Sequence, residues 1–166
     1  MYSLFYRSIQ KILLKRSFYN DFLKIIKNED INQIVEIGCA DSVILKNLNE
    51  KYYYDGFDLE QDFIIKSKDI YAHNEKYKFE KKSIHEIDFS NYDNEKTIIL
   101  LIGVFHHVND EYIKIFLKKS DKFKVYAIDA VRLTDQSFFT KLLMNLDKGK
   151  FVRDETHYKK LLHEIY

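Results

Sequence analysis

The sequence predicts an α/β fold, in which a doubly wound sheet of five parallel strands carries helices on both faces. Two observations predict it. Short apolar runs alternate along the chain with segments in which apolar residues recur at helical spacing. The apolar runs also have hydrophobic residues at consecutive positions, as in strands that are covered on both sides. Since crossover connections are right-handed, we expect the strand order 3-2-1-4-5.

Each element follows from this alternation. Strands are expected at residues 33–37, 53–58, 77–82, 97–103 and 124–129. Helices are expected at residues 41–49, 61–71, 110–119, 136–146 and 154–165. The last helix has Tyr158, Leu161, Leu162 and Ile165 at positions i, i+3, i+4 and i+7, which gives it one apolar stripe. Residues from about 4 to 27 also show helical periodicity, and we interpret residues 1–28 as a helical cover of the domain.

Composition restricts the class of protein. A chain of 166 residues without a linker-like segment is expected to form a single domain, residues 1–166. A net charge of +1 gives no field that would recruit nucleic acid. No apolar stretch reaches the roughly 18 residues of a membrane span, and Arg7 and Lys11 interrupt the N-terminal segment, so we expect no signal peptide. One cysteine fits a reducing compartment, and we expect a cytoplasmic protein.

The first strand ends in a turn of small residues. Gly38 follows the apolar run, and Cys39, Ala40 and Ser42 come next in a chain that has only four glycines and no proline. Such a turn between a strand and a helix N-terminus lets a nucleotide lie against the main chain. Asp58 ends the second strand twenty residues later, where a carboxylate can accept the hydroxyl protons of a ribose.

Four strand ends together point to a family. They are residues 36–40, 56–59, 103–110 (with His106-His107) and 128–132. These segments resemble class I S-adenosylmethionine-dependent methyltransferases, which have a Rossmann-like fold, and the resemblance runs from about residue 20 to 166. The tail at residues 146–153 is similar to a segment of a bacterial subgroup associated with small-molecule and polysaccharide-cluster methyltransferases. The chain ends before the strand hairpin that usually closes the family's sheet.

The resemblance implies that S-adenosylmethionine is the cofactor, and it assigns roles by position. Gly38 would carry the methionine part of the cofactor in the turn with Cys39 and Ala40. Glu36 would hold the turn and the cofactor's amino group. The remaining positions implied are Asp58 for the ribose, Leu59 beside the adenine, Ser83 and Ile84 at the adenine edge, and Gly103 and Val104 on the methionine side.

The sequence departs from the family pattern at several positions. Ala40 and Ser42 replace the second and third glycines of the turn, and a Cβ would be strained wherever φ must be positive. Ser83 replaces the usual Asp at the adenine edge, and Thr97 stands where an acid often opens the fourth strand. These changes bear on cofactor affinity more than on the fold. Cys39 is interpreted as a packing residue, because no activating partner is evident.

His106 and His107 are the candidate catalytic residues. A histidine beside the cofactor could remove a proton from a hydroxyl acceptor, because its pKa lies near working pH. The alternative is a structural histidine bonded to a loop. No metal site is expected, since two adjacent imidazoles rarely chelate one ion. The charged residues Asp129, Arg132, Asp147 and Arg153 form either a substrate-side cluster or internal salt bridges that fix the tail.

The sequence therefore predicts methyl transfer from S-adenosylmethionine to an oxygen of a small molecule or sugar. The alternatives are a non-catalytic member of the family and a nicotinamide-dependent oxidoreductase. The latter is disfavoured because Val43 stands where its fingerprint needs glycine or alanine. Nothing in the sequence replaces the missing hairpin, so we expect one of three outcomes: the edge of the fifth strand pairs with another chain, as in a homodimer, or lies under residues 136–166, or leaves the protein only marginally soluble.

Overall fold

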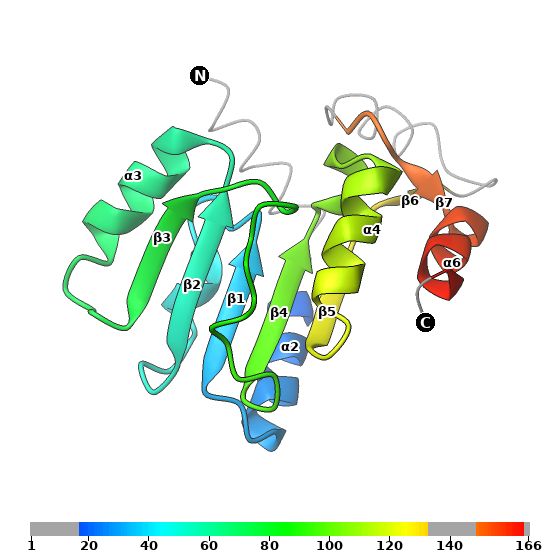
Figure 1. The fold of residues 1–166 in the computed structure, drawn as a ribbon. Helices are drawn as coiled ribbons and strands as arrows, with labels where there is room; N and C mark the ends of the chain where they lie inside the picture. The colour runs from blue at the N-terminus through cyan, green and yellow to red at the C-terminus, as the bar shows by residue number, and fades with distance from the viewer. Residues whose placement is uncertain (1–16, 133–148, 165–166) are drawn as a thin grey trace.

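Five parallel strands form the central sheet of the protein in a computed structural model that describes residues 17–132 and 149–164 (Figure 1). The strands are β1 (Gln33–Ile37), β2 (Tyr53–Asp58), β3 (Tyr77–Lys81), β4 (Thr97–Ile102) and β5 (Lys124–Ile128). Their order is β3-β2-β1-β4-β5, and all four neighbouring pairs are parallel. The predicted fold class and strand order are confirmed.

Helices cover both faces of this sheet (Figure 1). The α-helices are α2 (Ser17–Asn28), α3 (Gln61–Ile70), α4 (Asp110–Lys119) and α6 (Glu155–His163). Phe22 and Ile26 of α2 are fully buried in one apolar cluster, which also contains Ile64 of α3. Phe116 of α4 and Leu161 of α6 belong to the cluster on the opposite face. Packing of apolar side chains on both faces explains why all six residues of β4 are buried.

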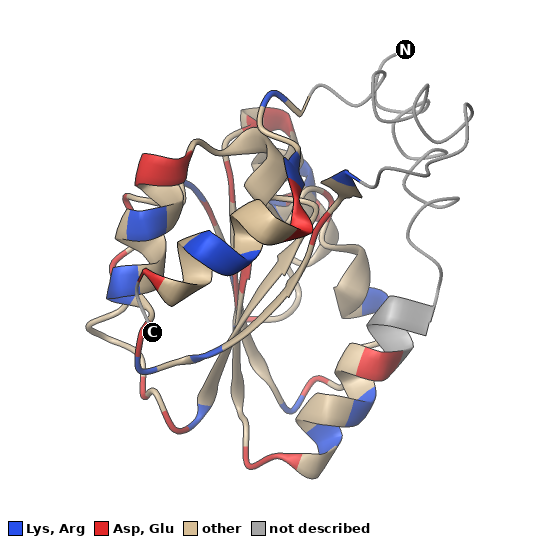
Figure 2. Ribbon diagram, turned by 90° about the vertical axis from the view of Figure 1, so that its right-hand side faces the viewer, with Lys and Arg blue, Asp and Glu red and all other residues tan. Residues whose placement is uncertain are grey.

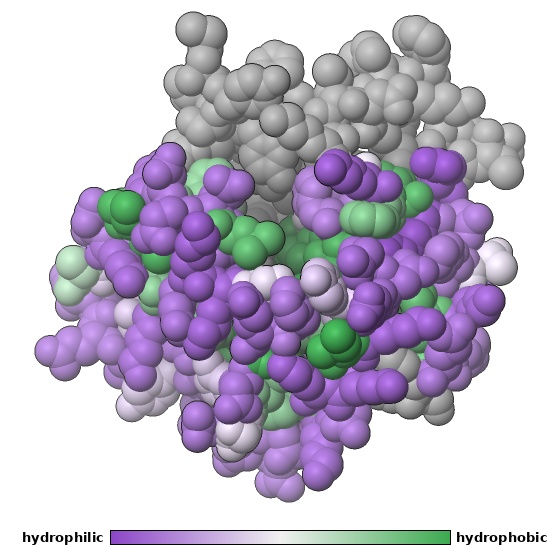
Figure 3. All heavy atoms as spheres, turned by 45° about the horizontal axis from the view of Figure 1, so that its top comes forward, coloured by the Kyte–Doolittle hydropathy of each residue, from purple (hydrophilic) through white to green (hydrophobic). Residues whose placement is uncertain are grey.

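The switch in strand order lies between β1 and β4. The chain runs outward from β1 through β2 to β3 on one side, and from β4 to β5 on the other. Loops that leave the carboxyl ends of β1 and β4 therefore diverge and leave room between them. Figure 3 looks onto this face of the molecule and shows a hollow with hydrophobic side chains at its floor. This is where the predicted site residues converge.

The helix predicted at residues 41–49 is wrong. The chain there forms only a short 3₁₀ helix, η1 (Val43–Lys46). Ala40 and Ser42 have φ angles of 45° and 51°, in the left-handed region, so the right-handed helix cannot begin before residue 43. Asn47 already ends it, with its N–H bonded to the carbonyl of Ile44. A second 3₁₀ helix, η2 (Phe105–His107), follows β4.

The C-terminal part differs from expectation in one respect. A parallel pair of two-residue strands, β6 (Val131–Arg132) and β7 (Arg153–Asp154), forms a sheet separate from the central one. The predicted helix at residues 136–146 and the first part of the predicted 1–28 cover lie outside the described residues. The described part of that cover, α2, is a layer of the core. None of the described helices has both the length and the apolar content that a membrane crossing requires.

Candidate functional site

The turn after β1 is held in an unusual backbone conformation. Gly38, Ala40 and Ser42 all have positive φ, at 71°, 45° and 51°. The N–H groups of Gly38 and Cys39 both donate to the carbonyl of Phe57, at 2.7 and 3.0 Å. All three positions at which the family pattern has glycine are thus left-handed. Only the first is glycine, so the other two carry strain of about 1–2 kcal/mol each.

Asp58 ties this turn to the end of β2. One carboxylate oxygen accepts the N–H of Ala40 at 2.9 Å, and the other accepts the N–H of Glu60 at 2.9 Å. The N-cap of α3 is Glu60, so Asp58 is not itself the helix cap. Each carboxylate oxygen can accept more than one hydrogen bond. Asp58 therefore keeps acceptor capacity toward a ligand while it orients the turn.

Glu36 lies buried directly before the turn. Its side chain accepts a hydrogen bond from the hydroxyl of Tyr54, which reaches it from β2. Burial raises the pKa of Glu36 to about 8; the Tyr54 hydrogen bond opposes this, and the carboxylates of Asp58 and Asp41 add to it. Three carboxyl groups thus converge on one turn. Such an arrangement favours a ligand with positive charge.

Gly56 makes room for this arrangement, and the sequence analysis assigned it no such role. A Cβ at Gly56 would lie 2.9 Å from the ring of Tyr54, 3.0 Å from the sulfur of Cys39 and 3.0 Å from Phe79. Because Gly56 has no side chain, the side chains of Tyr54, Cys39 and Phe79 can pack against its backbone. Cys39 is 4% exposed, and burial raises its pKa, so the thiol stays protonated.

The end of β4 meets the turn of β1. A Cβ on Gly38 would lie 2.6 Å from a methyl carbon of Val104, so the turn after β1 and the segment after β4 are in contact here. Gly103 also has a positive φ, of 67°, and its N–H donates to the carbonyl of Ile128 at 2.8 Å. The structure therefore brings together the residues predicted on the methionine side, which are Gly38, Gly103 and Val104.

The predicted adenine edge is only partly assembled. The hydroxyl of Ser83 lies 2.8 Å from Nδ1 of His85, and the His85 ring stacks on Tyr112 of α4 at 4.0 Å. Ile84 is buried in the core, and Leu59 is 60% exposed. Ser83 thus already has a protein partner. The stacking of His85 on Tyr112, which was not predicted from the sequence, orients the His85 ring that bonds Ser83.

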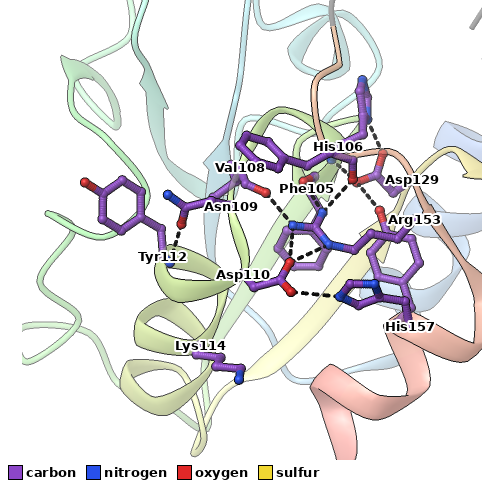
Figure 4. Close-up of polar contacts among 12 residues, drawn as sticks. Phe105, His106, Val108, Asn109, Asp110, Tyr112, Lys114, Asp129, Arg153 and His157 are labelled. Carbon is purple, nitrogen blue, oxygen red and sulfur yellow. Dashed lines mark hydrogen bonds and ion pairs between the residues drawn. The ribbon is translucent and has the colours of Figure 1, made fainter.

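His106 forms a buried pair with Asp129. Nδ1 of His106 bonds to one oxygen of Asp129, and the backbone N–H of His106 donates to the other at 2.8 Å (Figure 4). The N–H of Ala130 and the hydroxyl of Tyr158 also donate to this carboxylate, at 2.7 and 3.2 Å. Bonded in this way, Asp129 fixes the imidazole ring and favours the tautomer with hydrogen on Nδ1. His107 is exposed, and its ring lies 4.1 Å from that of His106.

Arg153 fastens the C-terminal segment to the loop after β4. Its guanidinium donates to the carbonyls of Phe105, Val108 and Phe151, at 2.7, 2.6 and 2.9 Å. It also bonds Asp110 through two nitrogens, at 2.8 and 2.6 Å (Figure 4). The side chain is 4% exposed. Of the two interpretations of the charged residues, Arg153 fits the internal salt bridge.

The same segment packs on His106. A Cβ at Gly149 would lie 2.4 Å from Cδ2 of His106, and the N–H of Phe151 donates to the His106 carbonyl at 3.0 Å. Arg132 is exposed, and Asp147 lies outside the described residues. Among the residues that the structure describes, no group of three or more His, Cys, Asp or Glu could hold a metal ion.

Comparison with known proteins finds a similar fold among solved structures. No protein-family model and no curated protein matches the sequence. Among solved structures, the YcgJ protein from Bacillus subtilis has a TM-score of 0.68 at 10% identity, over 90% of this chain and 68% of that one. The methyltransferase domain of bacterial CtHen1-CN has a TM-score of 0.66 at 15% identity, over 89% and 83%.

A geranyl diphosphate C-methyltransferase from Streptomyces coelicolor A3(2) has a TM-score of 0.63 at 9% identity. The similarity covers 82% of this chain and 55% of that one. The neighbouring structures are mostly class I S-adenosylmethionine-dependent methyltransferases. The predicted resemblance is therefore confirmed at the level of the fold.

Proposed function

We propose that this chain, which has the class I methyltransferase fold, transfers a methyl group from S-adenosylmethionine to an oxygen of a small molecule or sugar. The observation that carries the proposal is the set of three carboxyl groups at the Gly38 turn, contributed by Glu36, Asp41 and Asp58. The cofactor has a sulfonium and an ammonium group. A ligand with these charges is attracted to a site from which an anionic one is repelled.

The alternative of a nicotinamide cofactor fits this geometry poorly. A pyrophosphate needs the N-terminus of an α-helix at the turn, and η1 has only four residues. The carboxylates of Asp41 and Asp58 at the same turn would repel its negative charges. The other alternative, a non-catalytic member of the fold, is favoured by the strained Ala40 and Ser42. The Asp58 and Glu36 contacts at the turn nevertheless retain the groups that a cofactor needs.

The residues would act as follows. Asp58 would accept the ribose hydroxyls, Glu36 would hold the ammonium group, and Gly38, Cys39, Ala40, Gly103 and Val104 would line the methionine part. Leu59, Ser83 and Ile84 would flank the adenine. The cofactor, when bound, supplies an activated methyl group. His106, oriented by Asp129, would take the acceptor's proton, and His107 is the second candidate for this role.

Two of the similar solved structures support the choice of S-adenosylmethionine. The geranyl diphosphate C-methyltransferase and a phosphoethanolamine N-methyltransferase from Haemonchus contortus were crystallised with S-adenosylhomocysteine. Calorimetric titration with S-adenosylmethionine and with NAD separates the alternatives. We expect binding of the first alone. Asp58→Ala should weaken it by about 1.5–3 kcal/mol, the range for a lost hydrogen bond to a charged group.

The setting of this activity is also a proposal. We propose one domain over residues 1–166, a cytoplasmic location and a small-molecule acceptor. A nucleic-acid partner is disfavoured by the net charge of +1, and Figure 2 shows both signs of charge over the helices and loops. A homodimer through β5 is proposed because no described strand pairs with its outer edge, whereas the outer strand β3 exposes Lys78, Glu80 and Lys81.

A further inference from the structure

Tyr54 holds Glu36 in an enclosed position beneath the Gly38 turn. Both side chains are buried, at 0% and 4% exposure, and the Tyr54 hydroxyl donates to the Glu36 carboxyl. The Tyr54 ring reaches this point under β2 because Gly56 has no Cβ. The carboxyl is therefore held near Cys39 and Asp41 of the turn by a hydroxyl group from the neighbouring strand.

The charged and titratable groups around Glu36 are acids, phenols and a thiol. Asp41 and Asp58 approach from the turn and from the end of β2, and both raise the pKa of Glu36. Cys39 lies in the same turn, and Tyr71 approaches from the end of α3. Lys66 of α3 lies 3.8 Å from Asp41 and pairs with that carboxylate.

The other side chains of this cluster are apolar. Ile34 precedes Glu36 on the same face of β1, and Phe22 and Ile26 of α2 cover that face. A buried carboxyl in such surroundings keeps its proton until a positive charge arrives. An ammonium group that binds at the turn would supply that charge.

We infer that Tyr54 is a positioning residue for the cofactor's ammonium group, and that binding of the cofactor at the Gly38 turn releases the Glu36 proton. The inference rests on the proposed function. The ammonium and the Glu36 carboxylate form a charge pair that replaces the proton, and the Tyr54 hydroxyl keeps its hydrogen bond to the carboxylate. The proton leaves to solvent, so the charge balances.

The consequence is an affinity that depends on pH in a defined direction. Below the pKa of Glu36, each unit by which the pH falls should weaken cofactor affinity about tenfold, since one proton must be displaced. The cofactor's own amino group loses its proton at about pH 8, so an alkaline decline is common to every variant. The fall in cofactor affinity between pH 7 and pH 5.5, called the acid limb below, is caused by protonation of Glu36.

The test is calorimetry of the full chain with S-adenosylmethionine in two buffers of different ionisation enthalpy. At pH 6.5, we expect release of close to one proton per cofactor bound in the wild-type protein. Glu36→Gln keeps the shape and cannot titrate, so it should release none and lose the acid limb. Tyr54→Phe should shift the acid limb to higher pH and weaken affinity at pH 7 at least about fivefold, because the carboxylate loses its donor.

Tyr52→Phe is the matched control. Tyr52 is 1% exposed, and its hydroxyl donates to the carbonyl of Ile26 at 3.3 Å without touching Glu36. Removal of the Tyr52 hydroxyl should leave both the number of protons released and the acid limb as they are in the wild type. Binding without proton release, or a Tyr54→Phe profile equal to that of Tyr52→Phe, would overturn the inference alone. Absence of S-adenosylmethionine binding at every pH would overturn the proposed function as well. If Tyr54→Phe does not fold, the proton count of Glu36→Gln decides the matter.

Discussion

Replacement of Ala40 by glycine should stabilise the protein, although such a change destabilises most proteins. Ala40 has a φ of 45°, where a Cβ costs about 1–2 kcal/mol. Its hydrogen bonds use only the backbone: the N–H donates to Asp58, and the carbonyl accepts from the hydroxyl of Ser67 at 3.4 Å. Glycine keeps both bonds and removes the strain.

The opposing term is the greater freedom of glycine in the unfolded chain, which costs about 0.4–1 kcal/mol. The net gain in the free energy of unfolding is therefore up to about 1.5 kcal/mol. For a chain of this size, 1 kcal/mol raises the melting temperature by about 2–4 °C. Urea denaturation and thermal unfolding of Ala40→Gly both measure it.

Ala127 provides the control. It is exposed in β5, where φ is negative, so Ala127→Gly should lower the free energy of unfolding by about 0.5–1 kcal/mol. Ser42→Gly should gain less than Ala40→Gly, because the Ser42 hydroxyl lies 3.3 Å from that of Ser67 and this contact is lost. If Ala40→Gly loses as much stability as Ala127→Gly, the reasoning from backbone strain is refuted.

Four further predictions follow from the contacts. Arg153→Met should lower the free energy of unfolding by about 3 kcal/mol in urea, since three carbonyls each lose a donor at a cost of about 1 kcal/mol or more, while Asp110 keeps its contact with His157; a loss below about 1 kcal/mol would contradict the internal role of Arg153. His106→Ala should reduce turnover of the acceptor about 10²–10⁴-fold while cofactor affinity is retained, and full activity in this variant and in His107→Ala would leave proximity as the sole source of catalysis. Because the pKa of Glu36 is raised from 4.5 to about 8, the folded protein loses stability as pH rises between these values. Glu36→Gln should therefore melt at a higher temperature than the wild type at pH 8 and not at pH 4, and equal differences at both pH values would argue against it. Sedimentation should show a dimer that Ala127→Lys converts to a monomer, and a wild-type monomer would exclude pairing through β5.

The strands could be predicted from the sequence because a strand that is buried on both faces has apolar residues at consecutive positions. In β4, Thr97–Ile102, every position is buried, and the predicted range was nearly the observed one. The switch point between β1 and β4 followed from topology, whereas the grouping of Gly38 with Val104 followed from the family resemblance. A run of about five or six apolar residues indicates burial on both faces, and it can be recognised without knowledge of the rest of the fold.

The helix after the turn could not be predicted in this way. Residues 41–49 have helical spacing of apolar side chains, but the backbone angles of Ala40 and Ser42 prevent an α-helix from starting there. Those angles are imposed by hydrogen bonds to Phe57 and Asp58 on another strand. A local pattern does not report such tertiary constraints.

Pairs formed across the fold were equally inaccessible. His106 and Asp129 were each identified from the sequence, but their pairing depends on the side-by-side ends of β4 and β5. The bond from Tyr54 to Glu36 depends on the space at Gly56, which was quoted only as part of a strand end. Residue type indicates what a side chain can do. The register of the strands determines which partner it meets.

The charged side chains on β3 have a consequence for symmetry. A sheet with two receptive edges could add copies head to tail without end, since a heterologous contact need not close. Here Lys78, Glu80 and Lys81 are exposed on one outer strand, and β5 at the other edge has a single terminal lysine, Lys124. If two copies pair through β5, as proposed, the contact joins two β5 edges related by a two-fold axis. Assembly through this sheet would then stop at two copies, because the charges on β3 disfavour the addition of a further strand.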